Sequence, residues 1–363
     1  MQLATTISHP SLATAERAAP RVREATLVKC GFLRHVHYFR AFAIVSILFA
    51  HLWELPIGHA DRPLLYSVRE LLFHASTMYF LFISGFLFIH LSDNFDAKRY
   101  YRSKALYVLL PYTLLSTAIF CVKRGPALGG SSAFEFLKDL GRTLLTGTAV
   151  GPYWYIPFAG VTFLVSPLLL AMPARALRWL CLLACPLPLL GTRTPSLTFS
   201  LLLYFFPVYL LGCLAATNYG AFTAWVRARR LHLVLTAVLS SVLLAVLAAA
   251  PYKAGPVNVT DSLFYIQKIS ICFLVLEALQ RWESRDARLL GSIASCSFAI
   301  YFTHPILASA ELRLKVLSLL PNVEWLVVAS SVALVPVILG FNLLLCLAAK
   351  RVLGRRSRYL IGA

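Results

Sequence analysis

The stretch YFRAFAIVSILFAHLW, residues 38–53, decides the fold class of this chain. It is apolar and long enough to begin a membrane span, yet it contains Arg40 and His51. Ionisable side chains are costly inside hydrocarbon, so they are functional candidates there. The two residues lie eleven positions apart, and eleven steps of about 100° return to nearly the same helix face, about 16 Å further along the axis. The stretch therefore predicts a membrane helix with a cation near one edge and an imidazole deep inside, on one face.

The rest of the chain has the composition of a polytopic membrane protein. Of its 363 residues, 59% are hydrophobic and 13% are charged, whereas a soluble domain has about 25% charged residues. The formal net charge of +19 does not indicate nucleic-acid binding, because the basic residues lie between hydrophobic runs and not among stacking aromatics. We therefore expect an all-α helix bundle that is a multi-pass protein of the lipid bilayer, with no nucleic-acid partner.

The eight cysteines show no CxxC pattern and no Cys/His ligand spacing. Most of them lie in apolar runs, where a free cysteine packs as a small hydrophobic residue. We predict no metal site, and no nucleotide-binding or hydrolase motif is present.

Ten spans of about 20 residues each are predicted, and the fifth is short and interrupted by Pro186 and Pro188. The expected domains are a basic cytoplasmic tail over 1–35 without the apolar centre of a signal peptide, a ten-helix membrane domain over 36–349, and a basic cytoplasmic tail over 350–363. The spans are 38–56, 67–91, 105–122, 153–173, 177–191, 197–217, 231–250, 261–280, 290–311 and 324–349.

Charge predicts the orientation of the bundle. If the N-terminus is cytoplasmic and all ten spans cross, the cytoplasmic segments hold most of the 34 Lys and Arg residues. An excess of Lys and Arg marks cytoplasmic loops. We therefore expect both termini on the cytoplasmic side, with Arg40 near that side and His51 in the far half of the membrane.

Other polar residues are predicted at a depth similar to that of His51. Glu54 follows His51 by three positions, Glu70 precedes His74 by four, and both spacings bring side chains together on a helix. His304 in the ninth span completes a possible proton-handling site. Two alternatives remain open: Arg40 snorkels to the interface, and the histidines make ordinary interhelical hydrogen bonds. Lys268 and Glu277 lie on opposite faces of the eighth span, and the sequence assigns them no role.

Three further features have both a functional and a structural interpretation. Ser84 and Gly85 allow a neighbouring backbone to approach closely. Lys98, Arg99 and Arg102 suit phosphate recognition, and they also fit a simple positive-inside loop. Trp154 at the start of the fourth span fits the aromatic belt of a membrane interface.

Together these motifs resemble the acyltransferase 3 family of membrane-bound O-acyltransferases. Arg40 and His51 match the spacing of the family's first-helix motif. FISGFL at 82–87, the basic run at 98–102, Tyr-Trp-Tyr at 153–155 and SFAIYFTHP at 297–305 resemble later family motifs in order and spacing. The resemblance covers residues 38 to about 306. Ser76-Thr77-Met78 departs from the lead that often precedes the second-helix motif.

The resemblance implies acyl transfer, commonly of acetyl, from cytoplasmic acyl-CoA to a hydroxyl of an extracytoplasmic glycan or lipid-linked sugar. The size looks like that of stand-alone bacterial exopolysaccharide acetyltransferases, the xanthan-modifying type among them. We expect Arg40, Lys98, Arg99 and Arg102 to hold the CoA phosphates of acetyl-CoA, with no metal. His51 is expected to act as general base or acyl acceptor, because its unperturbed pKa suits proton transfer at neutral pH.

The same expectation assigns supporting roles to Glu54, Glu70, His74, Ser84, Gly85, Trp154 and His304. It places the protein in a bacterial inner membrane, with polysaccharide-assembly proteins as possible partners. Two other classes remain open on the sequence. One is a transporter of a lipid-linked sugar or small anion, because polar groups at mid-membrane depth and broken helices fit that class too. The other is a structural subunit of a polysaccharide-export complex.

Overall fold

The computed structural model describes residues 32–52, 63–124, 132–194, 196–249, 258–307 and 324–362. Within these residues every regular element is a helix, as the sequence predicts. Most of the expected N-terminal tail and all of Glu54 lie outside them. The expected C-terminal tail at 350–363 forms the last turn of one helix, a 3₁₀ turn and a short helix.

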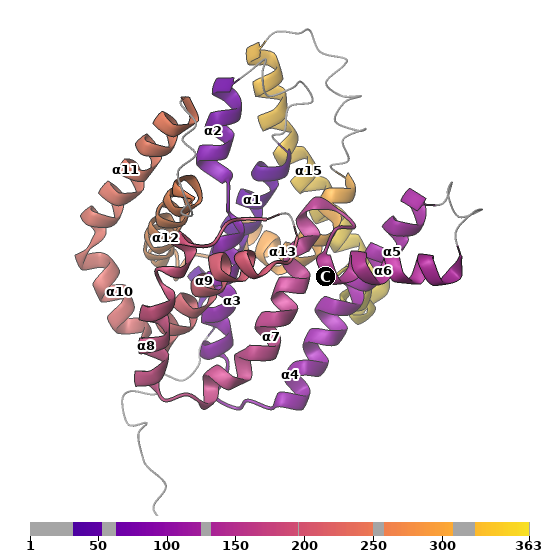
Figure 1. Cartoon of the computed structure of the whole chain (residues 1–363), viewed down its shortest axis with the longest axis horizontal. Coiled ribbons are helices and arrows are strands. Elements are labelled where there is room, and N and C mark those ends of the chain that lie inside the picture. Colours follow the sequence, from indigo (N-terminus) through magenta and orange to yellow (C-terminus); the bar gives the residue numbers. More distant parts are fainter. Residues whose placement is uncertain are drawn as a thin grey trace, which may run out of the picture. The chain divides into compact units, whose positions relative to one another are not determined.

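The helices follow one another along the chain as Figure 1 shows. They are α1 (Arg34–Leu52), α2 (Pro63–Phe73), α3 (Thr77–His90), α4 (Ala97–Lys104), a π-helical turn η1 (Ala105–Leu109), α5 (Leu110–Arg124), α6 (Ala133–Thr146), a 3₁₀ turn η3 (Gly151–Trp154), α7 (Tyr155–Ala171), α8 (Ala174–Ala184), a 3₁₀ turn η4 (Leu187–Leu189), α9 (Phe199–Thr217), α10 (Tyr219–Ala228), α11 (Arg230–Ala249), α12 (Val259–Gln280), α13 (Arg288–Leu307), α15 (Glu324–Leu353), a 3₁₀ turn η5 (Gly354–Arg356) and α16 (Ser357–Ile361).

Eight segments in the described part are long and apolar enough to cross a membrane. α1 is not among them, and the last part of the first predicted span, beyond Leu52, lies outside the described residues. The eight are Val68–His90, Ala97–Arg124, Gly151–Ala171, Phe199–Thr217, Arg230–Ala248, Val259–Gln280, Arg288–Leu307 and Val332–Ile361.

The predicted span at 177–191 is not one continuous helix. α8 has 11 residues, which reach about 16 Å and so cover half of a hydrocarbon core of ~30 Å. Pro186 and Pro188 lie just beyond its end, where they stop the helix. α8 and η4 pack along α9, with the Cys181 thiol donating to the Leu210 carbonyl at 3.3 Å, and the loop after them brings Arg193 beside His74.

α1 lies among the other helices and packs against α13, α3, α12 and α15 (Figure 1). Its fully buried side chains include Phe39, Ile44 and Leu48. The polar residues of α1 are therefore held by an apolar core, which fixes the directions in which they point.

α3 and α9 cross at two glycines. A Cβ on Gly85 would lie 2.1 Å from the Tyr209 carbonyl oxygen, and one on Gly212 would lie 2.0 Å from the Phe82 carbonyl oxygen. Only glycine fits so close a backbone contact. The close contact therefore supports the packing interpretation of Gly85, and the neighbouring Ser84 is half-buried.

The predicted second span is a broken helix. α2 ends at Phe73 and α3 begins at Thr77, with a turn between them. Ala75 has a φ of +56°, which is unusual for a residue other than glycine. Such backbone is stable at membrane depth only where protein surrounds it or where it lines a cavity. The break is therefore a candidate location for a functional site.

Candidate functional site

A cavity of about 80 Å³ opens at the break between α2 and α3. Its wall comes from the C-terminal half of α1, the last turns of α2, the break itself and the loop that follows η4. This volume holds roughly two or three water molecules. The lining residues are Ile47, Ala50, His51, Arg69, Glu70, Phe73, His74, Ala75, Ser76, Thr77 and Arg193.

His51 and Arg40 both face α13, so they share one face of α1 as their spacing indicates. Arg40 donates to the Ser297 hydroxyl at 3.1 Å, and the His51 ring centroid lies 5.6 Å from that of His304. Since 40 pairs with 297 and 51 with 304, the two helices run parallel. α13 therefore accompanies α1 from the Arg40 end to the cavity.

His304 is fully buried behind His51. Its Nδ1 donates to the Ile300 carbonyl at 3.1 Å, because a carbonyl oxygen can only accept. This bond fixes the tautomer and leaves the lone pair on Nε2. In the described part of the chain this Nε2 has no hydrogen-bond partner, so it remains an acceptor beside the His51 ring.

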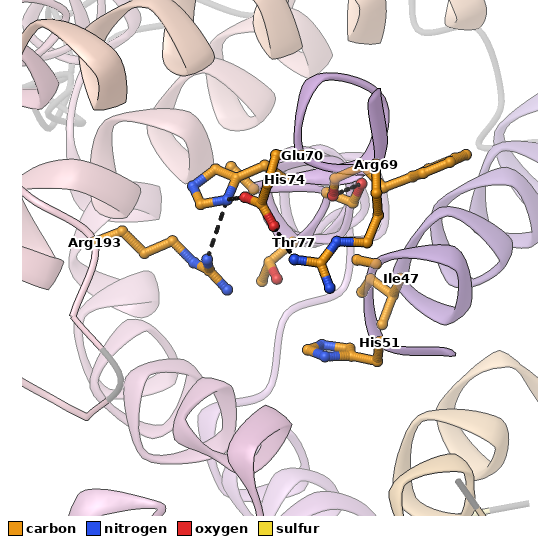
Figure 2. A pocket seen from close by; sticks show the side chains of 11 residues that line it. Ile47, His51, Arg69, Glu70, His74, Thr77 and Arg193 are labelled. Atoms are coloured by element: carbon orange, nitrogen blue, oxygen red, sulfur yellow. Dashed lines mark hydrogen bonds and ion pairs between the residues drawn. The ribbon is translucent and has the colours of Figure 1, made fainter. Parts of the chain in front are cut away.

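Glu70 joins two basic side chains on the other wall of the cavity. His74 Nδ1 donates to one carboxylate oxygen, and Arg69 donates to the other. Figure 2 shows the Arg69 guanidinium on the side of the cavity where His51 lies, with Arg193 entering from the opposite side. The predicted Glu70–His74 pair is therefore a hydrogen-bonded unit that faces the same space as His51.

The loop after η4 adds Arg193, the second arginine of the lining. The Arg193 guanidinium lies 3.5 Å from His74 Nδ1, and its backbone N–H donates to Asp261 at 3.1 Å. Asp261, in the first turn of α12, has an oxygen 3.9 Å from His74 Nε2. Two guanidinium groups, two carboxylates and two imidazoles thus converge around the cavity. Such an arrangement can move a proton and stabilise a developing negative charge.

The predicted cation cluster at the other end of α1 is arranged differently from the expectation. Lys98, Arg99 and Arg102 are exposed on α4, where Asp96 caps the helix through the backbone of Lys98 and Arg99. The residue of this run that interacts electrostatically with Arg40 is Lys104, whose ammonium also lies 4.6 Å from the Phe163 ring centroid. Lys104 lies two residues beyond the run at 98–102, and it adds a second positive charge near Arg40.

Trp154 packs inside the protein, whereas an aromatic residue of an interfacial belt faces lipid. The Trp154 side chain is 4% exposed and stacks on Phe205 with ring centroids 5.1 Å apart. Gly147, at a φ of +74°, places its α-carbon so close that a Cβ would lie 2.4 Å from Trp154 Cα. Trp154 is part of the core and does not contact the cavity at the α2–α3 break.

Sequence reasoning missed Arg69, Arg193 and Asp261. Arg69 adjoins Glu70 and could have been considered with it. The signal for Arg193 was the short, proline-interrupted span just before it, since irregular backbone at membrane depth lines cavities. Asp261 carries no such signal, because an acidic residue in the first turn of a helix is a common feature. Glu54 lies outside the described residues, and among those described no group of His, Cys, Asp and Glu could hold a metal ion.

A protein-family model described as "Acyltransferase domain" matches residues 34–350, which include every residue of the cavity lining. Searches of curated proteins and of solved structures each gave no match.

Proposed function

This chain belongs to the acyltransferase 3 family and is a multi-pass membrane acyltransferase; from that premise we propose that it acetylates a glycan. The donor is cytoplasmic acetyl-CoA, and the acceptor is a hydroxyl of an exopolysaccharide or its lipid-linked precursor. The membrane is a bacterial inner membrane, with both termini on its cytoplasmic side. The resemblance of the sequence motifs to exopolysaccharide acetyltransferases supports the acceptor class and the location.

One observation carries the proposal: His51 and the Glu70–His74 pair line the same cavity. His51 lies on the face of α1 that also presents Arg40. A base and an anion-binding group on one face are what acyl transfer from a CoA thioester requires. Arg40 lies about 16 Å along the axis from His51. A pantetheine arm could cover this distance between phosphates at Arg40 and a thioester in the cavity.

In the direct route, His51 takes the proton of the acceptor hydroxyl as its oxygen attacks the thioester carbonyl. A carbon–oxygen bond forms, and the carbonyl oxygen becomes negatively charged. The Arg193 and Arg69 guanidinium groups stabilise this oxyanion, as preorganised donors do in other acyl transfers. The carbon–sulfur bond then breaks, and the proton on His51 passes to the CoA thiolate.

A two-step route uses the same atoms. The His51 imidazole attacks the thioester, CoA leaves, and the acceptor hydroxyl then takes the acetyl group from the ring nitrogen. His74 has Glu70 as a hydrogen-bonded partner and can serve as the base for the second step. The two routes differ in one observable, because only the second one labels the protein in the absence of acceptor.

Membranes that contain the protein, labelled acetyl-CoA and a panel of candidate glycans test the proposal. Label that enters a glycan with wild-type protein and not with His51→Ala supports it. If folded wild-type protein labels no glycan and instead moves an unmodified sugar across the membrane, the chain is a transporter and the proposal is wrong.

A further inference from the structure

The broken end of α2 is capped by a buried lysine from another helix. The Lys268 ammonium on α12 donates to the carbonyl oxygens of Leu72 at 2.8 Å and Leu71 at 3.1 Å. Gln267 also donates to Leu71, at 3.2 Å. The last carbonyls of a helix have no partner within it, and inside a membrane an unpaired carbonyl costs several kcal/mol. α12 therefore supplies the donors that let α2 stop at mid-span.

Lys268 is an expensive residue for this purpose. Its side chain is 0% exposed, and in the described part of the chain no ion pair joins it to a carboxylate. Buried cations without a direct partner are rare because desolvation is costly. A neutral donor such as glutamine could make one of the same bonds, so the charge itself requires an explanation.

That explanation is the position of the capped turn in the cavity wall. Glu70 and His74 lie on either side of Leu71 and Leu72, and the Lys268 ammonium also attracts the Glu70 carboxylate electrostatically. The partial negative charge of the helix C-terminus adds to this attraction. Movement of the α2 end would therefore displace both members of the Glu70–His74 pair.

One face of α12 makes three contacts with His74 and the turn before it. Asp261 lies 3.9 Å from His74 Nε2, the Phe264 ring centroid lies 4.2 Å from that of His74, and Lys268 holds the carbonyls. The spacing i, i+3, i+7 places all three on one side of the helix. Asp261 and Phe264 contact the His74 ring from two directions, while Lys268 holds the backbone just before His74.

We propose that Lys268 is a positioning residue of the acyltransferase: by capping the broken end of α2 it holds Glu70 and His74 across the cavity from His51. The structural part of this role rests on the hydrogen bonds of Lys268. Its effect on catalysis rests on the proposed function.

The experiment compares Lys268→Met, which keeps the length and removes the charge, with Lys268→Arg, which restores a cationic donor. Lys123→Met is the matched control, because Lys123 also donates to a backbone carbonyl, that of Ala149 at 2.7 Å, but contributes nothing to the cavity lining. We expect Lys268→Met to lower kcat about tenfold or more, since small misplacements of catalytic groups are that costly. KM for acetyl-CoA should stay within about twofold, and Lys268→Arg should recover most of the loss.

A double-mutant cycle with Glu70→Gln separates positioning from general destabilisation. If Lys268 acts through the Glu70 turn, Lys268→Met has little further effect on kcat once Glu70 is changed. Losses that multiply in the double variant, or a Lys268→Met protein that keeps wild-type kcat, would overturn the proposal.

A second readout does not depend on the reaction. A cysteine introduced at Thr77, in the cavity wall, is labelled with a soluble thiol reagent, and the chain without it provides the background rate. Lys268→Met should change the labelling rate severalfold while Lys123→Met does not. If this change is seen in a protein that acetylates nothing, the positioning role stands and the proposed function fails. If the labelling rate is unchanged, the positioning role fails.

Discussion

The two ends of the α1 face that carries Arg40 and His51 differ in how their charges are paired. At the cavity, Arg69 and His74 share the Glu70 carboxylate, and Asp261 lies beside His74. At the other end, the hydrogen-bond partner of Arg40 within the described part of the chain is a neutral hydroxyl, and another cation, Lys104, interacts with it electrostatically. A compensated cluster is suited to hold groups in fixed geometry, whereas an uncompensated one is suited to attract an anion. The comparison separates a reaction end from a docking end.

The strongest test of the reaction end is His51→Ala. We expect transfer to the glycan to fall by a factor of about 10² to 10⁴, the usual contribution of a general base. The measurement is the initial rate of label incorporation at equal amounts of folded protein.

The control is His232→Ala on α11, where the histidine is exposed. It should leave the rate within about twofold. Equal losses in the two variants would show that the effect is not specific to the cavity.

Arg193→Gln tests whether the loop after η4 stabilises the oxyanion. Removal of one such donor commonly costs about 10² to 10³ in kcat. We expect a loss near the lower value with little change in KM for either substrate, because the charge develops only in the transition state. Arg178→Gln on the exposed side of α8 is the control. A rise in KM for the glycan with unchanged kcat would instead make Arg193 an acceptor-binding residue.

Arg40→Gln tests the docking end. The variant should raise KM for acetyl-CoA about tenfold and leave kcat nearly unchanged. The CoA phosphates stay at Arg40 throughout the reaction, so their binding stabilises the ground state and the transition state equally. The comparison substrate is an acetyl-pantetheine thioester, which lacks the nucleotide phosphates. Wild type should prefer acetyl-CoA, and the variant should lose most of that preference. If the preference is retained, the phosphates bind elsewhere.

The smallest expected effect concerns the anchor of the docking end. Glu283 accepts hydrogen bonds from the backbone N–H groups of Arg34 and His35, at 3.0 and 2.8 Å, and from the His35 ring. Partial burial acts to raise the pKa of this carboxyl, but these bonds outweigh it and hold the pKa below its usual value. A lowered pKa contributes stability above the unfolded value, and that stability is lost as pH falls through the folded value.

Wild type should therefore keep its advantage in thermal unfolding over Glu283→Gln from pH 7 down to about 5, and lose it as pH falls further, below about 4. Asp286→Asn is the control, because the Asp286 side chain is 73% exposed. If the gap between wild type and Glu283→Gln stays constant across this pH range, the carboxylate does not anchor α1.

Helical period accounts for most of what the sequence predicts correctly. The shared face of Arg40 and His51 and the Glu70–His74 bond follow from distances of eleven and four residues along one helix. Residues that meet across helices follow no such rule. Arg193, Asp261 and Lys268 meet the last turn of α2 and His74 because α2 breaks and α8 stops early. A hydrophobic pattern over 67–91, in contrast, predicts one continuous span. Lys268, which the sequence assigns no role, donates hydrogen bonds to the carbonyls at the broken end of α2.

The glycine crossing of α3 and α9 has a consequence for how this bundle could be redesigned. Each added Cβ would meet a backbone atom of the partner helix and not a side chain. Backbone atoms are the same for every amino acid, so no change on α9 can make room for a larger residue at 85, and none on α3 for one at 212. A combinatorial library that varies both helices should therefore return glycine at each position separately, with no compensating pairs among the survivors.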